Sequence, residues 1–215
     1  MKSRVVIAID GTSASGKSTN ARLVAKALGF LYVDTGAMYR TLAWYCLKNR
    51  ISLDDEKAVI NACRKWKTDL EATNGQVRFL VDGYHPVKEI RTAETSAAVA
   101  HVAAIGKVRD WMKARQRECL RFGSLVMEGR DIGTVVFPET NFKFYLDASL
   151  DERAKRRAAE GVHENLAARD HKDSQRAVAP LMVPLGATVI NTSGDTPEQT
   201  SQRIIGEVRK KLKPA

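Results

Sequence analysis

The chain has 215 residues, of which 44% are hydrophobic and 28% charged, so it suits one folded domain with a small inserted part and excludes two large independent domains. Its net charge of +10 predicts anionic partners, and because the 35 lysines and arginines are spread along the chain without an aromatic RNA-binding motif, we expect phosphate pockets and no nucleic-acid partner. The N-terminal apolar run, residues 5–9, is too short for a signal peptide or membrane span, which predicts a cytoplasmic protein with no membrane partner.

The first elements read as strand, loop, helix. An almost wholly apolar run at residues 4–9 predicts a strand buried on both faces of a parallel sheet. After a glycine-rich turn, apolar residues at helical spacing predict a helix over residues 18–28 that stops at Gly29. A second strand is expected at residues 30–33, and Asp34 then opens a helix running towards Leu47.

The residue pattern in the middle of the chain changes from helical to β-like. β-like runs flank Asn74-Gly75, the strongest two-residue hairpin signal, and Asp82-Gly83 marks another turn. Residues 68–89 therefore predict a small antiparallel insert. Helical periodicity returns over residues 91–121, with Gly106 as the break between two helices.

The last third returns to alternating strands and helices. Short apolar runs at residues 125–127, 142–146 and 187–190 predict three more strands, and residues 197–212 predict a C-terminal amphipathic helix. This alternation indicates an α/β fold of three layers, α/β/α, around a central parallel sheet. Ligands of such sheets bind at the carboxyl ends of the strands.

The loop after the first strand carries a complete phosphate-binding pattern. Its sequence, GTSASGKS, matches G-x-x-x-x-G-K-[ST] between a predicted strand and a predicted helix. Glycines let the backbone bend so that successive N–H groups point at the phosphates. Lys17 would reach the β- and γ-phosphates, and Ser18 would hold the Mg²⁺ that bridges them. The candidate nucleotide-binding residues are Gly11, Thr12, Ser13, Ala14, Ser15, Gly16, Lys17, Ser18 and Thr19.

Isolated arginines indicate what happens to the γ-phosphate. They stand at strand ends and on one helix: Arg40, Arg130, Arg169, Arg176, Arg153, Arg156 and Arg157. Phosphoryl transfer depends on aligning two anionic substrates and neutralising the charge between them, which guanidinium groups do well. The N-K-x-D loop of GTPases is absent. We interpret Asp147 as a turn or helix-start residue in preference to a metal-binding carboxylate.

The cysteines and histidines point to no transition-metal site. Cys46, Cys63 and Cys119 are odd in number and form no C-x-x-C pair, so reduced, buried thiols are expected. The histidines are equally scattered, at positions 85, 101, 163 and 171.

Three segments resemble the bacterial cytidylate kinase family: GTSASGKST after the first strand, DTGAMYR after the second and EGRDIGTVVFP after the third. DHKDSQRAVAPL is similar to the lid-side segment of that family, and EIRT and VRDWMKARQR are similar to its acceptor-side helices. The resemblance covers almost the whole chain. The P-loop is shared with many NTPases, whereas the second and third segments in this order are specific.

The resemblance implies an ATP- and Mg²⁺-dependent kinase that phosphorylates CMP and dCMP, and we expect it to be a monomer. A P-loop NTPase-like core, about residues 1–34, 122–150 and 177–215, would hold ATP. Residues 35–121, which include the β insert, would hold the monophosphate, and residues 151–176 would form a short helical lid. The catalytic residues would be Lys17, Arg130, Arg153 and Arg157. The monophosphate would contact Thr35, Arg40, Arg109, Arg130, Asp131, Arg169, Asp173 and Arg176.

Within this set the resemblance implies separate roles. Arg40 and Arg130 would grip the acceptor phosphate, while Thr35, Arg109 and Asp131 would face the pyrimidine. Asp173, Arg176 and Arg169 would hold ribose and phosphate as the lid closes. A carboxylate at position 131 suits cytosine, because it accepts the N4 amino hydrogens that uracil lacks. The alternative for Asp131 is an ion pair with Arg130 or a loop cap.

The chain also departs from the family pattern. Ala100 stands where the family often has serine, Glu128 stands where aspartate is common, and the stretch from 157 to 169 is shorter than in the longer members. In a helix Arg153 and Arg157 would share one face, solvated while the lid is open and turned to the phosphates once it closes. The alternative is that both are ordinary surface arginines on an exposed helix.

Two other functions stay open from the sequence. One is a kinase for a different monophosphate, such as UMP or AMP, or for another small molecule. The other is a P-loop ATPase that binds nucleic acid, which would show a steep salt dependence and hydrolysis without an acceptor.

Overall fold

The structure is a computed structural model of the chain, and it describes residues 4–159, 161, 165–176 and 178–212. His163 lies outside the described residues, as do parts of the expected core and lid.

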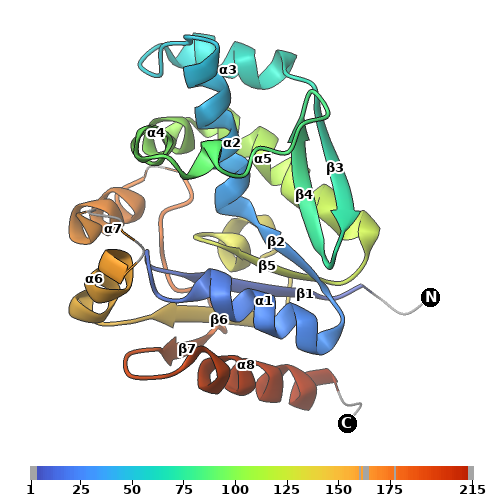
Figure 1. Cartoon of the computed structure of the whole chain (residues 1–215). Coiled ribbons are helices and arrows are strands. Elements are labelled where there is room, and N and C mark those ends of the chain that lie inside the picture. Colours follow the sequence, from blue (N-terminus) through green and yellow to red (C-terminus); the bar gives the residue numbers. More distant parts are fainter. Residues whose placement is uncertain (1–3, 160, 162–164, 177, 213–215) are drawn as a thin grey trace.

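A seven-stranded sheet runs through the molecule in the order β3-β4-β2-β5-β1-β6-β7 (Figure 1). The β3–β4 pair is antiparallel, and the other described strand pairs are parallel. The strands are β1 Val6–Gly11, β2 Leu31–Asp34, β3 Thr68–Thr73, β4 Gln76–Val81, β5 Leu125–Gly129, β6 Phe142–Asp147 and β7 Thr188–Asn191.

Helices cover both faces of this sheet. The α-helices are α1 Lys17–Leu28, α2 Thr35–Lys48, α3 Glu56–Lys65, α4 Ala93–Ala104, α5 Gly106–Glu118, α6 Leu150–Ala159, α7 Leu166–Ser174 and α8 Pro197–Leu212. Short 3-10 helices span Glu89–Arg91 and Cys119–Phe122, and a π-helical turn spans Ile132–Val136. Among the described residues, no helix combines the length and apolar character that a membrane span requires.

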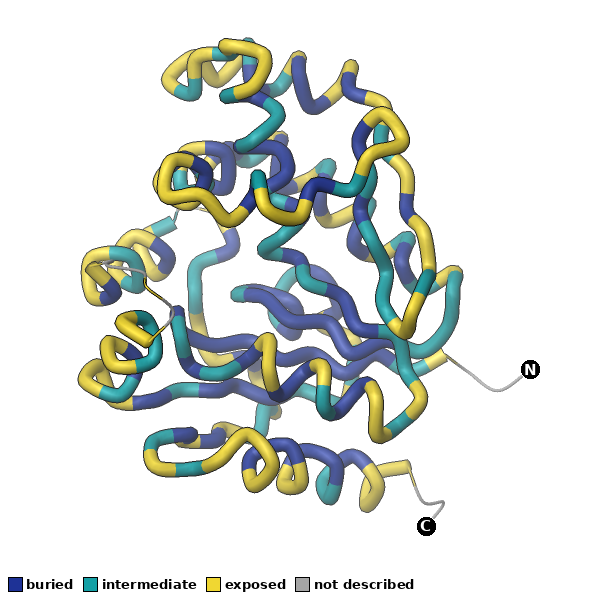
Figure 2. Tube along the Cα trace, in the orientation of Figure 1, coloured by how far each residue is buried: buried dark blue, intermediate teal, exposed yellow. Residues whose placement is uncertain are grey.

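The central strands bury alternate residues in two cores, which is the dark interior in Figure 2. From β1, Val6 and Ala8 pack with α2 to α5, whereas Ile7 and Ile9 pack with α1 and α8. This follows from the two-residue period of a strand, whose neighbouring side chains point to opposite faces. The expected three-layer α/β/α architecture is confirmed. Cys46, Cys63 and Cys119 are free and buried, as expected.

The hairpin is confirmed, although it is less separate than expected. Asn74 and Gly75 have φ values of 49° and 73°, as a tight two-residue turn between antiparallel strands requires. Strand β4 then pairs with β2 at one position, Tyr32 opposite Gln76, so the hairpin forms the edge of the central sheet. Helix α3 was not predicted.

The loops that bear the candidate residues all follow the carboxyl ends of parallel strands. Strands β1, β2, β5 and β6 are mutually parallel, so their carboxyl ends lie together. The P-loop follows β1, Asp34 ends β2, Arg130 and Asp131 follow β5, and Asp147 ends β6. The fold thereby gathers residues that are more than 130 positions apart in the sequence.

Candidate active site

The P-loop is shaped by backbone conformations that favour glycine. A Cβ atom on Gly11 would lie 1.9 Å from the carbonyl oxygen of Leu146, so only glycine fits between β1 and β6. Gly16 has a φ of 87° and stands at the N-terminus of α1. Residues 11–18 therefore curl around the start of this helix, where N–H groups and the helix dipole favour an anion.

Lys17 lies over this loop. Its Nζ donates a hydrogen bond to the carbonyl oxygen of Thr12 and lies 3.5 Å from Ser15 Oγ. Burial lowers the pKa of Lys17 well below its usual range, and the positive charges of Arg130 and Arg169 lower it further. A lysine beside two arginines is stabilised when an anion such as a polyphosphate binds among them.

Arginines of α6 contact the same loop. Arg153 donates to the carbonyl oxygen of Ser13 at 3.2 Å and to that of Ala148 at 3.0 Å. Arg157 donates to Ser13 Oγ at 3.2 Å, and Arg156 donates to the carbonyl oxygen of Ala14 at 3.3 Å. The two predicted lid arginines do share a side of α6 that meets the P-loop. Arg153 is only 7% exposed because it packs into these carbonyl groups, so it is not an ordinary surface arginine.

Asp170 on α7 closes this arrangement. Its Oδ1 accepts from the backbone N–H of Ser13 at 3.2 Å, and its Oδ2 pairs with Arg153. One carboxylate thus joins α7, α6 and the P-loop. Nothing in the sequence distinguished Asp170 from the other acidic residues near it.

The loop after β5 is anchored by a buried carboxylate that we did not predict. Asp10, at 0% exposure, accepts hydrogen bonds from the N–H groups of Ile132 at 2.8 Å and Gly133 at 2.7 Å. Burial raises the pKa of Asp10 to about 7, against the opposing effect of these two bonds. Asp10 ends the strand that leads into the P-loop, so it ties the phosphate loop to the loop that carries Arg130 and Asp131. A carboxylate inside an apolar strand was the available signal.

Arg130 and Arg176 share one carboxylate. Arg130 Nε donates to Asp173 Oδ2 at 2.9 Å, and Arg176 pairs with Asp173 Oδ1. Burial alone would raise the pKa of Asp173, but the two arginines lower it. Burial lowers the pKa of Arg176, and the nearby Arg109 and Arg130 lower it further. Two positively charged side chains, Arg130 and Arg176, surround the single negative charge of Asp173, so the site is net positive.

Asp131 pairs with Arg109 and not with Arg130. Arg109 donates to Asp131 Oδ2 at 2.6 Å and to the carbonyl oxygen of Ala103 at 3.0 Å, so α5 holds the loop after β5. Both side chains are buried. Asp131 Oδ1 accepts no hydrogen bond from the described residues and is left to accept from a ligand.

Glu128 lies between the two loops. It is buried, it accepts from the Tyr32 hydroxyl at 2.8 Å, and its backbone carbonyl accepts from Thr35 Oγ1 at 2.7 Å. Burial raises the pKa of Glu128, as does the nearby Asp34, whereas Lys17 and the nearby Ser18 hydroxyl oppose the rise. The glutamate is thus a second acidic group at the P-loop, beside Ser18.

Asp34 confirms its expected role at the start of α2. Its side chain accepts from the N–H of Ala37 at 2.7 Å, which caps the helix. It also pairs with Arg40 at 3.0 Å and with Arg91 at 3.5 Å. Arg40 is therefore held at the end of β2 by the residue that caps its own helix.

Asp147 is the last residue of β6, so its interpretation as a turn or helix-start residue is wrong, because α6 begins only at Leu150. Asp147 Oδ1 accepts from Thr12 Oγ1 at 2.7 Å and from the N–H of Ala148 at 2.9 Å, which braces the P-loop against β6. Thr192, after β7, braces the other side by donating to the carbonyl oxygen of Ser15 at 3.0 Å.

The structure brings most of the predicted residues together but leaves some apart. Arg130 and Arg169 lie near enough to Lys17 for their charges to lower its pKa, and Arg109 and Arg130 do the same to the pKa of Arg176. Arg40 contacts Asp34 and no member of that cluster among the described interactions. Thr19 is exposed on α1 without a described contact, and Ala100 is half-buried on α4. The arrangement can hold two adjacent anionic groups, one at the P-loop and one at Arg130.

A sequence model of the cytidylate kinase family matches residues 7–210 of this chain. A cytidylate kinase from Geobacillus sp. is 41% identical over 224 residues, which cover 99% of this chain and 100% of the relative. Another, from Caldanaerobacter subterraneus, is 41% identical over 220 residues, which cover 97% of this chain and 96% of the relative. A solved structure from Thermus thermophilus is similar in fold, with a TM-score of 0.50 and 18% identity over 99% of this chain and 100% of that one.

Proposed function

The chain belongs to the cytidylate kinase family, and on that premise we propose that it transfers the γ-phosphoryl group of ATP to the phosphate of CMP or dCMP. The observation that carries the proposal is the convergence of Lys17, Arg130 and Arg169 at the end of the P-loop. Three cations at one place suit the charge shared by a transferring phosphoryl group and its two neighbouring phosphates.

ATP would bind to residues 11–19, with its phosphates against the N–H groups of the P-loop. Lys17 would move from its hydrogen bond with the Thr12 carbonyl oxygen to the β- and γ-phosphate oxygens. Those oxygens accept hydrogen bonds more strongly than a carbonyl, because they carry full charge.

Mg²⁺ is the metal we propose, and the donor set fits it. Kinase sites hold Mg²⁺ with one or two protein oxygens together with substrate phosphates, a demand that Ser18 and the adjacent Glu128 can meet. When bound, Mg²⁺ would neutralise charge on the β- and γ-phosphate oxygens.

The acceptor would lie between Arg130, Arg176 and the Asp131–Arg109 pair. Arg130 and Arg40 would hold its phosphate, and Asp173, Arg176 and Arg169 would hold its ribose and phosphate. Asp131 Oδ1, with Oδ2 fixed by Arg109, would accept from the cytosine N4 amino group. Thr35 would face the same base.

With both substrates in place, an oxygen of the CMP phosphate attacks the γ-phosphorus. The bond from that phosphorus to the bridging β,γ-oxygen breaks, and ADP leaves with the electron pair. Arg153 and Arg157 on α6 would neutralise the charge that spreads over the γ-phosphoryl oxygens. Because α6 and α7 already contact the P-loop, further closure of residues 151–176 would exclude the water that otherwise accepts the phosphoryl group.

The remaining features are proposals as well. We propose a core of about residues 1–34, 122–150 and 177–215, an acceptor region of residues 35–121 and a lid of residues 151–176. We also propose that the protein is a cytoplasmic monomer. Size-exclusion chromatography with light scattering tests the oligomeric state.

A coupled assay of ADP release, with ATP, Mg²⁺ and a panel of CMP, dCMP, UMP and AMP, tests the function. We expect CMP and dCMP to give the highest kcat/KM. Arg130→Ala should raise the KM for CMP and lower kcat while ATP affinity stays unchanged. Preferred turnover of UMP or AMP, or hydrolysis stimulated by nucleic acid and not by a monophosphate, would refute the proposal.

A further inference from the structure

A groove of about 490 Å³ opens where strands β2 and β4 separate, beside the site described above, with which it shares Tyr32 and Asp34. The two strands pair only at Tyr32 and Gln76 in the described structure. Beyond that position β2 leads into α2, whereas β4 continues beside β3 (Figure 1). The fork between them is lined by both strands, the first half of α2 and the segment 85–91.

The groove lies on the other side of α2 from the Asp131–Arg109 pair, although Asp34 in its lining also holds Arg40. Ala37 and Thr41 line the groove. Tyr39 instead faces Arg109, whose Cζ lies 5.5 Å from the centroid of the Tyr39 ring. Residues two positions apart point to nearly opposite sides of a helix. Helix α2 therefore stands between the groove and the Asp131–Arg109 pair.

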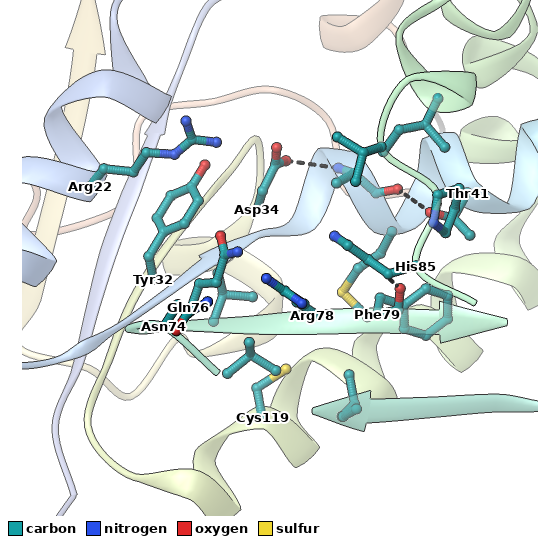
Figure 3. A pocket seen from close by; sticks show the side chains of 18 of the residues that line it. Arg22, Tyr32, Asp34, Thr41, Asn74, Gln76, Arg78, Phe79, His85 and Cys119 are labelled. Atoms are coloured by element: carbon teal, nitrogen blue, oxygen red, sulfur yellow. Dashed lines mark hydrogen bonds between the residues drawn. The ribbon is translucent and has the colours of Figure 1, made fainter. Parts of the chain in front are cut away.

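Three arginines make this groove positive. Arg22, Arg78 and Arg91 line it, together with the amide side chains of Asn74 and Gln76. Asp34 supplies the carboxylate among the described lining residues, and its charge is already shared with Arg40, its ion-pair partner at 3.0 Å. Figure 3 shows Arg22, Asp34, Arg78 and His85 arranged around one space.

Arg78 is the unusual member of this set. It is half-buried, its Nε is buried without an acceptor, and it makes no hydrogen bond or ion pair with the described residues. Glu71 stands directly opposite Arg78 on β3, yet no ion pair joins them. Buried donors in native proteins nearly always have an acceptor, and a guanidinium is better satisfied by an anion than by a neutral group.

The other two arginines are also available to an anion. Arg22 lies over the Tyr32 ring, with its Cζ 4.8 Å from the centroid, and it makes no hydrogen bond or ion pair with the described residues. Arg91 is exposed, and its contact with Asp34 is long at 3.5 Å. Both can turn to a ligand at little cost.

The floor of the groove is apolar. It is made by residues from β2, α2, β4 and the segment 85–91: Val33, Met38, Val77, Phe79 and Ile90. A cationic rim over an apolar floor suits a ligand with an anionic group at one end and an apolar or flat body at the other. The volume lies within the roughly 300–1,000 Å³ of small-molecule sites, and is large enough for a nucleotide.

We propose that this fork is a second ligand site, adjacent to the reaction site, for an organic phosphate of the nucleoside polyphosphate class. The three guanidinium groups would bind the phosphate chain, because each presents a planar fork of donors that matches phosphate oxygens. The apolar floor would take the nucleoside. A recessed groove of this size favours such a ligand over a nucleic acid, which needs an open track.

The test is calorimetry on full-length protein already saturated with CMP, Mg²⁺ and a non-hydrolysable ATP analogue, so that the reaction site is filled. The titrants are CTP, inorganic pyrophosphate and cytidine. We expect one further equivalent of CTP to bind, with pyrophosphate weaker and cytidine undetected. Pyrophosphate binding as tightly as CTP, or cytidine binding as tightly as CTP, would overturn the assignment to an organic phosphate.

Matched variants locate the site. Arg78→Gln should weaken binding of the additional CTP by about tenfold or more, as the loss of one charge-assisted contact predicts. Arg64→Gln, which removes the same charge from the exposed face of α3, should leave it unchanged. Both variants should keep wild-type kcat. Absence of the additional equivalent, or equal affinity in Arg78→Gln and wild type, would overturn the proposal, as would displacement of CTP by a short RNA that binds more tightly.

Discussion

Asp173 should stabilise the ligand-free protein by separating two arginines, and Asp173→Asn tests this. The side chain is 6% exposed and lies between those of Arg130 and Arg176, which are 17% and 13% exposed. The change to asparagine keeps the size of the side chain and removes its charge. Two largely buried guanidinium groups then face each other without a carboxylate.

The expected loss follows from this burial. Removing one partner of a fully buried ion pair costs about 3–5 kcal/mol. Asparagine keeps one oxygen as an acceptor and the arginines keep some contact with water, so we expect the free energy of unfolding to fall by about 2–3 kcal/mol. Urea unfolding at neutral pH, followed by circular dichroism, measures it. Asp110→Asn, on the exposed face of α5, is the control and should change stability little.

The pH dependence has a definite sign. Burial would raise the pKa of Asp173, but Arg130 and Arg176 lower it below the usual 3.8. A carboxyl with a lowered folded-state pKa stabilises the fold above its unfolded-state pKa and loses that effect as the pH falls through the folded-state pKa. The stability difference between wild type and Asp173→Asn should therefore be constant near neutrality and narrow below about pH 4.

Added phosphate supplies the second readout. An anion bound between Arg130 and Arg176 replaces the missing charge, and it no longer meets the repulsion of Asp173. Phosphate should stabilise Asp173→Asn more than wild type. Equal unfolding free energies in wild type and variant, or equal stabilisation of both by phosphate, would refute this account of the cluster.

Four further changes address single steps. Lys17→Ala should lower kcat by a factor equivalent to about 3 kcal/mol or more without unfolding the protein, and near wild-type ADP release would contradict its role at the phosphates. Asp131→Asn should reduce the CMP over UMP preference in kcat/KM by about 1–3 kcal/mol, whereas an unchanged ratio would leave Asp131 as a structural partner of Arg109. Asp10→Asn leaves one backbone N–H without an acceptor and should cost about 1–3 kcal/mol of stability in urea unfolding. Because burial raises the pKa of Asp10 from 3.8 to about 7, its stabilising effect is fully present below the unfolded-state pKa and is lost as the pH rises to 7, so the cost should narrow between about pH 4 and pH 7 and stay constant above; a constant gap over the whole range would argue against the raised pKa. Arg153→Gln breaks the pair with Asp170 and should lower kcat more than it changes either KM, and an unaltered kcat would exclude a role in the transition state.

The features that the sequence predicted well are local. The P-loop pattern, the Asn74-Gly75 turn, the Asp34 cap and the break at Gly106 each depend on a few adjacent residues whose backbone preferences are strong. The strands of the central sheet were found because both faces are buried, which makes their residues apolar throughout.

Helix α3 shows where a local signal was available but weak. It buries only Val59, Ala62 and Cys63, and its first turn is capped by Asp55, whose side chain accepts from the N–H of Ala58 at 3.0 Å. Three buried positions in ten residues make a short apolar stripe. The cap, followed by that stripe, would have predicted the helix.

The sequence by itself determined the fold class, the family and the residue types that can hold two phosphates, because motifs and periodicity express short-range preferences of the chain. Only the tertiary structure decided which polar groups meet: Asp10 with the N–H groups of Ile132 and Gly133, Asp173 with Arg130, and Asp131 with Arg109 in place of Arg130. The same holds for the fork beside Arg78, which exists because β4 leaves β2 after one paired position. An ion pair depends on the distance and burial of two side chains, and parallel strands with long crossovers set that distance independently of separation along the chain.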